Sequence, residues 1–451
     1  MAESTGRTTL AAAVGLVLAD SSIVVLALPE IYRELDVSVA AVVWVLIAFN
    51  LVLALAAVPA AHAAGTIGPA RLTAAGLVLF SAASLACGLA PSIEVLLAAR
   101  CVQAIGGAAA VCAALELMPA TYGSERRAAR AWAAAGATGA ALGPGVGGLL
   151  TELISWESIF LVQVPAALAF AVPLIAAARG EQRAARAPGS VRPHLAANAA
   201  LALVSAALAA ALFLVVLLLI EGWRLTPIAA AAAVSVLPVC SLLAAPLARR
   251  VAAVDARAAA GVILIAGGLA GLGLLPKASV LLTIPPQALV GVGLTLTLSA
   301  LTEAALAGRA PQAIHGGWTI AARHAGVVAG LLVLTPIFTG DLESERDDAE
   351  AAGTAALLDS RLSPGDKLDL AERIAAQIER EGDKVPVLGP AFEPLPDDPQ
   401  QRAETISLRT SIEDEVDRAA THAFSASFLI AAGFALAALI PIAIARRRIE
   451  L

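Results

Sequence analysis

The feature that most constrains this chain is a series of apolar segments, each long enough to cross a lipid bilayer. A helix needs about 20 apolar residues to span a hydrocarbon core of about 30 Å. Only 15% of the residues are charged, whereas soluble domains carry about a quarter. We expect twelve such spans, near residues 8–28, 38–61, 70–90, 93–118, 128–152, 157–178, 195–220, 227–248, 257–275, 279–305, 313–339 and 422–445. The sequence therefore predicts an all-α membrane protein with twelve transmembrane helices.

The arginines between the spans predict the orientation of the chain. Loops on the cytoplasmic side of a membrane carry an excess of Lys and Arg. With both termini in the cytoplasm, most loop arginines, from Arg7 to the terminal Arg446–Arg448 run, fall on one side, and the outer loops keep only Arg33, Arg224 and Lys277. The five tryptophans fall near predicted helix ends, which is typical of an interfacial aromatic belt. We therefore expect a multi-pass protein of a bacterial inner membrane.

The charge distribution divides the chain further. Residues 341–420 hold 21 acidic and 9 basic side chains, which leaves 15 acidic and 21 basic ones elsewhere. This segregation predicts an acidic extracytoplasmic insert on a basic membrane domain. The predicted units are an N-terminal six-helix bundle (1–178), a cytoplasmic linker (179–194), helices 7–11 of the C-terminal bundle (195–339), the acidic extracytoplasmic insert (340–421), and helix 12 with a basic cytoplasmic tail (422–451).

The insert itself is predicted to contain helices. Ser363 can cap a helix that has Pro364 in its first turn. One face of that helix would carry Leu370, Ile374 and Ile378. We expect a small helical unit rather than a loop.

A glycine pattern marks the fifth predicted span. Gly139, Gly143 and Gly147 recur every four residues, and Pro144 and Gly148 lie beside them. Small residues at this spacing let helix backbones approach closely, and a proline permits a bend. On spacing alone, a generic packing face is the favoured interpretation.

Several runs resemble the major facilitator superfamily. ALGPGVGGLLTELISWESIFLVQVP looks like its antiporter motif, and LVLADSSIVVLALPEI resembles the first helix of the drug:proton antiporter branch. LLAARCVQAIGGAA is similar to the fourth-helix motif, with Arg100, Gln103 and Gly106 at matching positions, and GGWTIAARHAGVVAG echoes the second half. The resemblance implies two six-helix bundles of the major facilitator fold around a substrate path.

Two departures from that branch stand out. The loop between helices two and three normally carries Gly-x-x-x-Asp-Arg-x-Gly-Arg. Here Gly68 and Arg71 remain, but Ala61, Gly65 and Thr66 stand where Gly, Asp and Arg are expected. The branch is also usually built with fourteen helices, and 179–194 leaves no room for two more. The charge latch associated with the loop is thus not expected in its usual form.

Charged residues within the spans are candidate functional residues because they are costly to place in a bilayer. Asp20 and Arg100 lie about eight and seven residues from the outer ends of their spans, hence at similar depth. They can pair. Asp20 would alternate between a proton and Arg100 in a coupling mechanism, whereas the structural alternative is a static ion pair that fastens two helices.

Other polar residues are weaker candidates for a cavity or coupling role. Arg323 and His324 lie about ten residues into span eleven, and Asn50 lies within span two. Glu116 and Glu303 fall near cytoplasmic helix ends, where an interfacial position is the simpler interpretation. Polar contacts between helices explain Arg323 and His324 at least equally well, and they are the favoured interpretation of Asn50.

The function implied is secondary active transport. We expect a proton-coupled exporter of hydrophobic or amphipathic small molecules that works by alternating access in the lipid bilayer. One alternative is export of a lipid or envelope precursor, with the insert as a docking or gating element. Another is a membrane receptor or scaffold that transports nothing. No catalytic motif, cofactor or metal site is predicted. The basic residues are scattered over short loops, which disfavours nucleic-acid binding. The four cysteines lie in apolar runs, so we interpret them as small hydrophobic residues.

Overall fold

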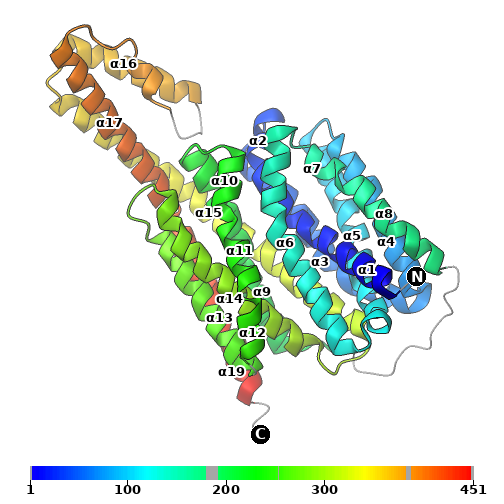
Figure 1. Ribbon diagram of the computed structural model, residues 1–451. Helices are drawn as coiled ribbons and strands as arrows, with labels where there is room; N and C mark the ends of the chain where they lie inside the picture. Colours follow the sequence, from blue (N-terminus) through cyan, green and yellow to red (C-terminus); the bar gives the residue numbers. More distant parts are fainter. Residues whose placement is uncertain (1–2, 179–190, 252, 382–386, 448–451) are drawn as a thin grey trace.

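The computed structural model describes residues 3–178, 191–251, 253–381 and 387–447. In these residues it is helical, without strands, and twelve segments are long and apolar enough to cross a membrane. This confirms the all-α class and the twelve predicted spans. Figure 1 shows the helices as two groups side by side, with both termini near the same end of the bundle. We call this end the terminal side and the opposite end the insert side. The linker expected at 179–194 lies outside the described residues except for 191–194.

The N-terminal half contains the first six spans. The first is broken near its insert-side end, and the sixth begins with a short separate helix. Its elements are α1 (Glu3–Ile23), η1 (Val24–Ala27), α2 (Leu28–Glu34), α3 (Val39–Ile67), α4 (Pro69–Gly88), α5 (Ile93–Tyr122), α6 (Glu125–Leu153), α7 (Ser158–Leu161) and α8 (Gln163–Ala178). Gly68, with φ of 104°, forms the turn between α3 and α4, a conformation that favours glycine. The backbone conformation therefore requires a glycine at position 68, one of the motif residues present in the loop between the second and third spans.

The C-terminal half contains the other six spans and the insert. Its elements are α9 (Leu195–Leu217), η2 (Leu218–Gly222), α10 (Pro227–Val234), α11 (Val236–Leu243), α12 (Ala245–Arg250), α13 (Val254–Gly273), α14 (Val280–Leu306), α15 (Gln312–Asp359), α16 (Pro364–Glu381), η3 (Gly389–Phe392), α17 (Pro399–His422), α18 (Ser425–Ala437) and α19 (Leu439–Arg447). His194 caps α9 by accepting a hydrogen bond from the amide of Ala197, and burial lowers the pKa of its imidazole. A neutral ring keeps the nitrogen that the cap needs.

Glycine contacts repeat between the two halves. A Cβ at Gly139 of α6 would lie 2.0 Å from a carbonyl oxygen of α1, and one at Gly326 of α15 would lie 2.0 Å from a carbonyl oxygen of α9. A Cβ at Gly106 of α5 would lie 2.6 Å from a backbone atom of α4, and one at Gly293 of α14 would lie 2.5 Å from a backbone atom of α13. First and fifth spans, and third and fourth, therefore pack alike in each half, as expected for two related six-helix bundles.

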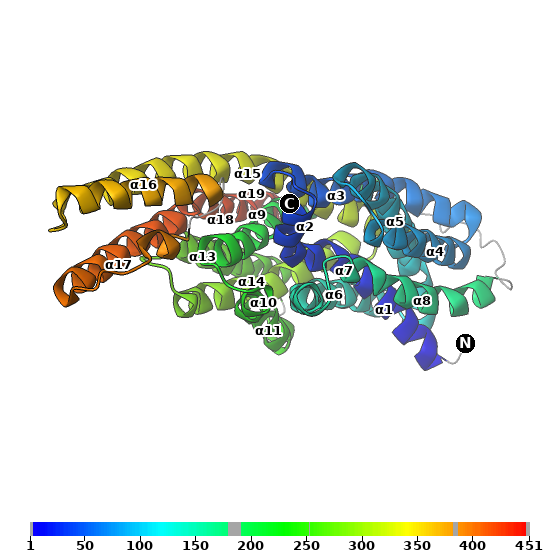
Figure 2. The same cartoon turned by 90° about the horizontal axis from the view of Figure 1, so that it is seen from above.

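The insert is built on a continuation of a membrane helix. α15 runs without interruption for 48 residues, so it leaves the bundle and forms one wall of the insert beside α16 and α17 (Figures 1 and 2). The amide of Asp366 donates to the hydroxyl of Ser363, which confirms the predicted cap. Leu370 is buried in a small apolar cluster against which Ile374 and Ile378 pack. The insert thus has a hydrophobic core of its own.

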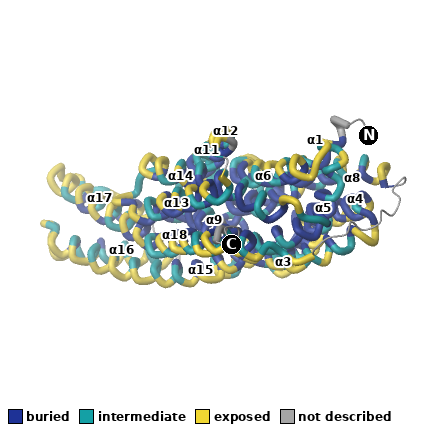
Figure 3. Tube along the Cα trace, turned by 90° about the horizontal axis from the view of Figure 1, so that it is seen from below, coloured by how far each residue is buried: buried dark blue, intermediate teal, exposed yellow. Residues whose placement is uncertain are grey.

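The predicted aromatic belt is wrong for two tryptophans. Trp132 and Trp156 are 0% and 2% exposed, whereas Trp44 is 46% exposed. Trp132 donates to the carbonyl of Val111 in α5, and Trp156 donates to the carboxylate of Glu34. Both indoles are therefore held inside the protein rather than at the headgroups. In Figure 3 the buried residues lie along the contacts between helices and the exposed ones along the outside.

Candidate functional site

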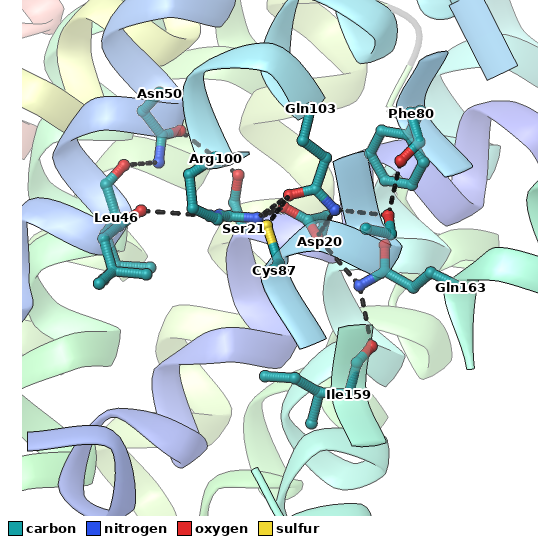
Figure 4. Close-up of polar contacts among 12 residues, drawn as sticks. Asp20, Ser21, Leu46, Asn50, Phe80, Cys87, Arg100, Gln103, Ile159 and Gln163 are labelled. Atoms are coloured by element: carbon teal, nitrogen blue, oxygen red, sulfur yellow. Dashed lines mark hydrogen bonds and ion pairs between the residues drawn. The ribbon is translucent and has the colours of Figure 1, made fainter. Parts of the chain in front are cut away.

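A buried ion pair lies inside the N-terminal half. Asp20 of α1 and Arg100 of α5 are both 0% exposed, and Nη1 of Arg100 contacts Oδ2 of Asp20 (Figure 4). The two residues expected to lie at equal depth are thus in direct contact. Charges removed from water require both a partner and further hydrogen bonds to offset the loss of hydration.

Two glutamines supply the further hydrogen bonds to the carboxylate. Nε2 of Gln103 and Nε2 of Gln163 lie 3.2 and 3.0 Å from Oδ1 of Asp20. Gln103 also accepts from Nη1 of Arg100 at 2.6 Å and donates to Ser84 at 2.8 Å. The carboxylate is therefore bound by one cation and two amides, which come from α5 and α8.

The guanidinium of Arg100 lies between aromatic rings. Its central carbon is 4.1 Å from the ring centroid of Phe49 and 5.5 Å from that of Phe160. Its Nε donates to the carbonyl of Val45 at 3.3 Å, while Nη2 has no hydrogen-bond partner among the described residues. Cation–π contacts stabilise an arginine without fixing all its donors, so one donor remains available.

Polar contacts lead from Ser21, the neighbour of Asp20 in the sequence, to the other half. Ser21, next to Asp20, donates to Oδ1 of Asn50 at 3.4 Å, and Nδ1 of His324 lies 2.6 Å from the same oxygen. The amide nitrogen of Asn50 donates to the carbonyl of Leu46. Asn50 and His324 are both buried. Two weaker candidates from the sequence are thus brought together where α3 meets α15.

Arg323 points between the two faces of α15. Gly317 and His324 face α3, and Gly326 faces α9. Arg323 lies three residues before Gly326, so helical geometry directs its side chain between these surfaces. It is partly exposed, and the described part of the chain gives it no hydrogen bond or ion pair.

Carboxylates join the halves on the terminal side. Oε2 of Glu116 in α5 accepts from the amide of Ala313, in the first turn of α15, at 2.8 Å. Glu303 of α14 binds Arg130 of α6 at 3.2 Å and Arg257 of α13 at 2.9 Å. Both glutamates therefore make contacts between halves or helices rather than facing water alone.

The insert side has matching contacts. Oε2 of Glu152 in α6 accepts from the amide of Ile228, in the first turn of α10, at 2.5 Å. Arg33 of α2 binds Glu221 of η2 at 2.6 Å. At each side a carboxylate from the N-terminal half thus binds the N-terminus of a helix in the C-terminal half, where the helix dipole favours negative charge.

The glycine motif of α6 lies at two contacts at once. A Cβ at Gly143 or Gly147 would lie 2.1 Å from atoms of Ser22 or Ile23 in α1. A Cβ at Gly148 would lie 2.6 Å from the Cβ of Ala231 in α10 of the other half. Pro144 is buried between them. The motif holds α6 against α1 and brings it to the interface between halves.

Sequence reasoning missed Gln163 and Glu152. Gln163 lies in the quoted run FLVQVP as the one polar side chain among apolar neighbours, and this isolation was the available signal. Glu152 gave no comparable signal, because a carboxylate at a helix end is usually solvated.

Two six-helix halves joined at both ends, with a buried charged pair inside the N-terminal half, are typical of a polytopic membrane transport protein. The family model described as Major Facilitator Superfamily matches residues 10–335. Since this is more than half of the sequence, the chain belongs to the major facilitator superfamily, and the resemblance of its motifs is confirmed.

Relatives of this chain carry names from drug resistance. It is 39% identical over 163 residues to the multidrug resistance protein Stp of Mycobacterium tuberculosis, covering 35% of this chain and 30% of that protein. It is 36% identical over 232 residues to the methylenomycin A resistance protein of Streptomyces coelicolor, covering 50% and 47%. It is 33% identical over 187 residues to the tetracenomycin C resistance and export protein of Streptomyces glaucescens, covering 41% and 35%. The matches therefore span less than half of each relative.

A solved structure resembles the whole chain. This is a bacterial homologue of the human lysosomal transporter Spinster, in an inward-facing and unoccupied conformation. The TM-score is 0.60 at 17% identity, covering 98% of this chain and 97% of that one. At this identity the likeness confirms the fold alone.

Proposed function

We propose that this transporter is a proton-coupled exporter of hydrophobic or amphipathic small molecules, located in a bacterial inner membrane with both termini in the cytoplasm. The contact of fully buried Asp20 with Arg100 carries the proposal. The arginine distribution supports the orientation, and the relatives named for resistance to several drugs and antibiotics support the cargo.

Protonation of Asp20 would release Arg100. A neutral carboxyl group no longer compensates the guanidinium, and an uncompensated buried charge costs several kcal/mol. The cost favours a rearrangement that brings water or substrate to the arginine. Nη2, which has no hydrogen-bond partner among the described residues, is the donor best placed to respond.

The rearrangement would reach the other half through Ser21, Asn50 and His324. These side chains connect the helix that bears Asp20 with α15. Alternating access then requires two states. In one, the contact of Glu116 with the start of α15 is broken while that of Glu152 with the start of α10 is intact; in the other, the first contact is intact and the second is broken. Arg323, which helical geometry directs between the surfaces of α15 that face α3 and α9, is a candidate substrate contact.

Proteoliposomes test the coupling. Wild-type protein is expected to move protons when a substrate such as methylenomycin A or a lipophilic dye is added, and Asp20→Asn should abolish this movement because the amide cannot take up the proton. Asp369→Asn, which changes an exposed carboxylate of α16, serves as the matched control. A pH-sensitive dye inside the vesicles gives the measurement.

Two outcomes would oppose the proposal. Normal coupling in Asp20→Asn would remove Asp20 from the mechanism. No substrate-dependent proton movement in the wild type, with any of the drugs tested, would favour the lipid-export or receptor alternatives.

A further inference from the structure

An apolar groove lies in the insert, away from the buried ion pair. Its volume is about 270 Å³, and it is enclosed by α15, α16 and α17. Its walls are formed largely by aliphatic side chains, among them Leu357, Ile374, Ile378, Ile412 and Val416. None of the residues of the candidate site lines it. Concave sites with apolar walls and a few polar groups are the usual form of a small-molecule site.

The groove is elongated and begins beside the membrane helices. Along α15 the lining residues recur from Leu342 to Leu357, a length of about 22 Å at 1.5 Å per residue. Ala419 and Ala420, near the end of α17 and just before α18 begins, line the end nearest the bundle. This shape fits one extended hydrocarbon chain better than a compact molecule.

Between its middle and its end nearest the bundle, the groove carries more acidic than basic side chains. Glu345 and Glu350 line it with Arg346, which binds Glu350 at 3.3 Å. Glu345 has no ion pair among the described residues. Its strongest electrostatic neighbour is His422, and the others are the acidic Asp348, Asp341 and Glu415. A negative potential attracts cations and repels anions.

We propose that this groove binds a single-chain amphiphile with a cationic head, with its hydrocarbon chain along α15 and its head beside Glu345. The apolar walls remove the chain from water, at about 0.8 kcal/mol for each buried methylene. The acidic side chains around Glu345 favour a positively charged head group over a negatively charged one. This binding is independent of proton coupling, so it can hold whether or not the proposed transport function is right.

Photolabelling of the full-length protein in nanodiscs tests the site. The probe is an alkyltrimethylammonium that carries a diazirine in its chain, and mass spectrometry locates the labelled peptides. We expect labels within 342–357, 371–378 and 412–420. Unlabelled alkyltrimethylammonium should compete, whereas an alkyl sulfate of the same length should not. Glu345→Gln should weaken this preference, and Glu343→Gln, an exposed change on the same helix, should not.

A groove-filling variant separates binding from folding. A Cβ at Gly353 would make only an ordinary contact of 3.6 Å with Ile412, so Gly353→Leu places the rest of its side chain in the groove while raising helix propensity. Labelling should fall by about tenfold, since the leucine occupies the space of several chain carbons. Gly340→Leu is the matched control, because nothing lies within 4 Å of a Cβ there. Undiminished labelling in Gly353→Leu, equal competition by the sulfate, or labels only in the membrane helices would overturn the proposal.

Discussion

At the scale of single residues, the proposed coupling role would require the pair of Asp20 and Arg100 to meet two requirements that usually conflict. A buried charge must be compensated to let the protein fold, but a coupling residue must be able to lose its partner. The carboxylate meets the first requirement with one guanidinium and two amides. In the proposed mechanism the aromatic contacts of Arg100 would serve the second, because rings stabilise a cation without fixed donor geometry.

Removing one member of the pair should be worse than removing both charges. Arg100→Ala leaves a buried carboxylate without its cation and is expected to lower the free energy of unfolding by about 3–5 kcal/mol. In Asp20→Asn/Arg100→Gln no charge remains buried, so most of that loss should be recovered. Thermal unfolding in detergent measures both variants. A double variant as unstable as Arg100→Ala would show that the charges are not coupled in the folded protein.

At the scale of helices, α6 is the element most constrained by backbone contact. Its glycines face α1 along two turns, and its insert-side end faces α10. The sequence indicated a packing face from the glycine spacing. It could not indicate that Gly148 meets the other half, because that contact depends on where two bundles join.

Two glycines only two residues apart should respond differently to the same change. A Cβ at Gly143 would lie 2.1 Å from the hydroxyl of Ser22, whereas the nearest atom to a Cβ at Gly145 is 3.9 Å away. Gly143→Val should therefore separate α6 from α1 and cost about 3 kcal/mol or more. Gly145→Val has the same helix propensity and should be tolerated. Equal unfolding temperatures for the two variants would contradict the observed packing.

At the scale of the whole molecule, the two halves are joined by similar contacts at opposite ends. Glu116 binds the start of α15 and Glu152 binds the start of α10. The usual acidic residue of the loop between the second and third spans is absent, since Gly65 stands at its position. On the terminal side, the carboxylate that joins the halves is instead that of Glu116 in α5, which binds the start of α15.

Loss of either carboxylate should open one side only. Removing a side chain that accepts from a helix N-terminus costs about 1 kcal/mol, or about fivefold in population. Glu116→Ala is expected to shift the molecule toward opening on the terminal side, and Glu152→Ala toward the insert side. Spin-label distances across each end, in protein without native cysteines, measure the shift. If the same side opened in both variants, the contacts of Glu116 and Glu152 would not act as gates for opposite sides of the molecule.

The sequence predicted the spans and the depth of the charged pair because hydrophobic length and helical rise determine both. Asp20 and Arg100 are in contact as that argument expected. It could not predict Gln163 as a ligand of Asp20, or the burial of Trp132, because both depend on which helix faces α1 or α5. It also placed a boundary at residue 340, where the hydrophobic pattern ends but the helix does not.

Because α15 is continuous, a change in its tilt within the bundle displaces the insert as well. From His324, at the interface between halves, to Leu357 in the insert core, the helix covers 33 residues, about 50 Å of rise. A small tilt at the membrane is therefore amplified at the far end. In the proposed alternating access, a tilt of α15 would be magnified at the insert, where a label would record it without perturbing the buried charges.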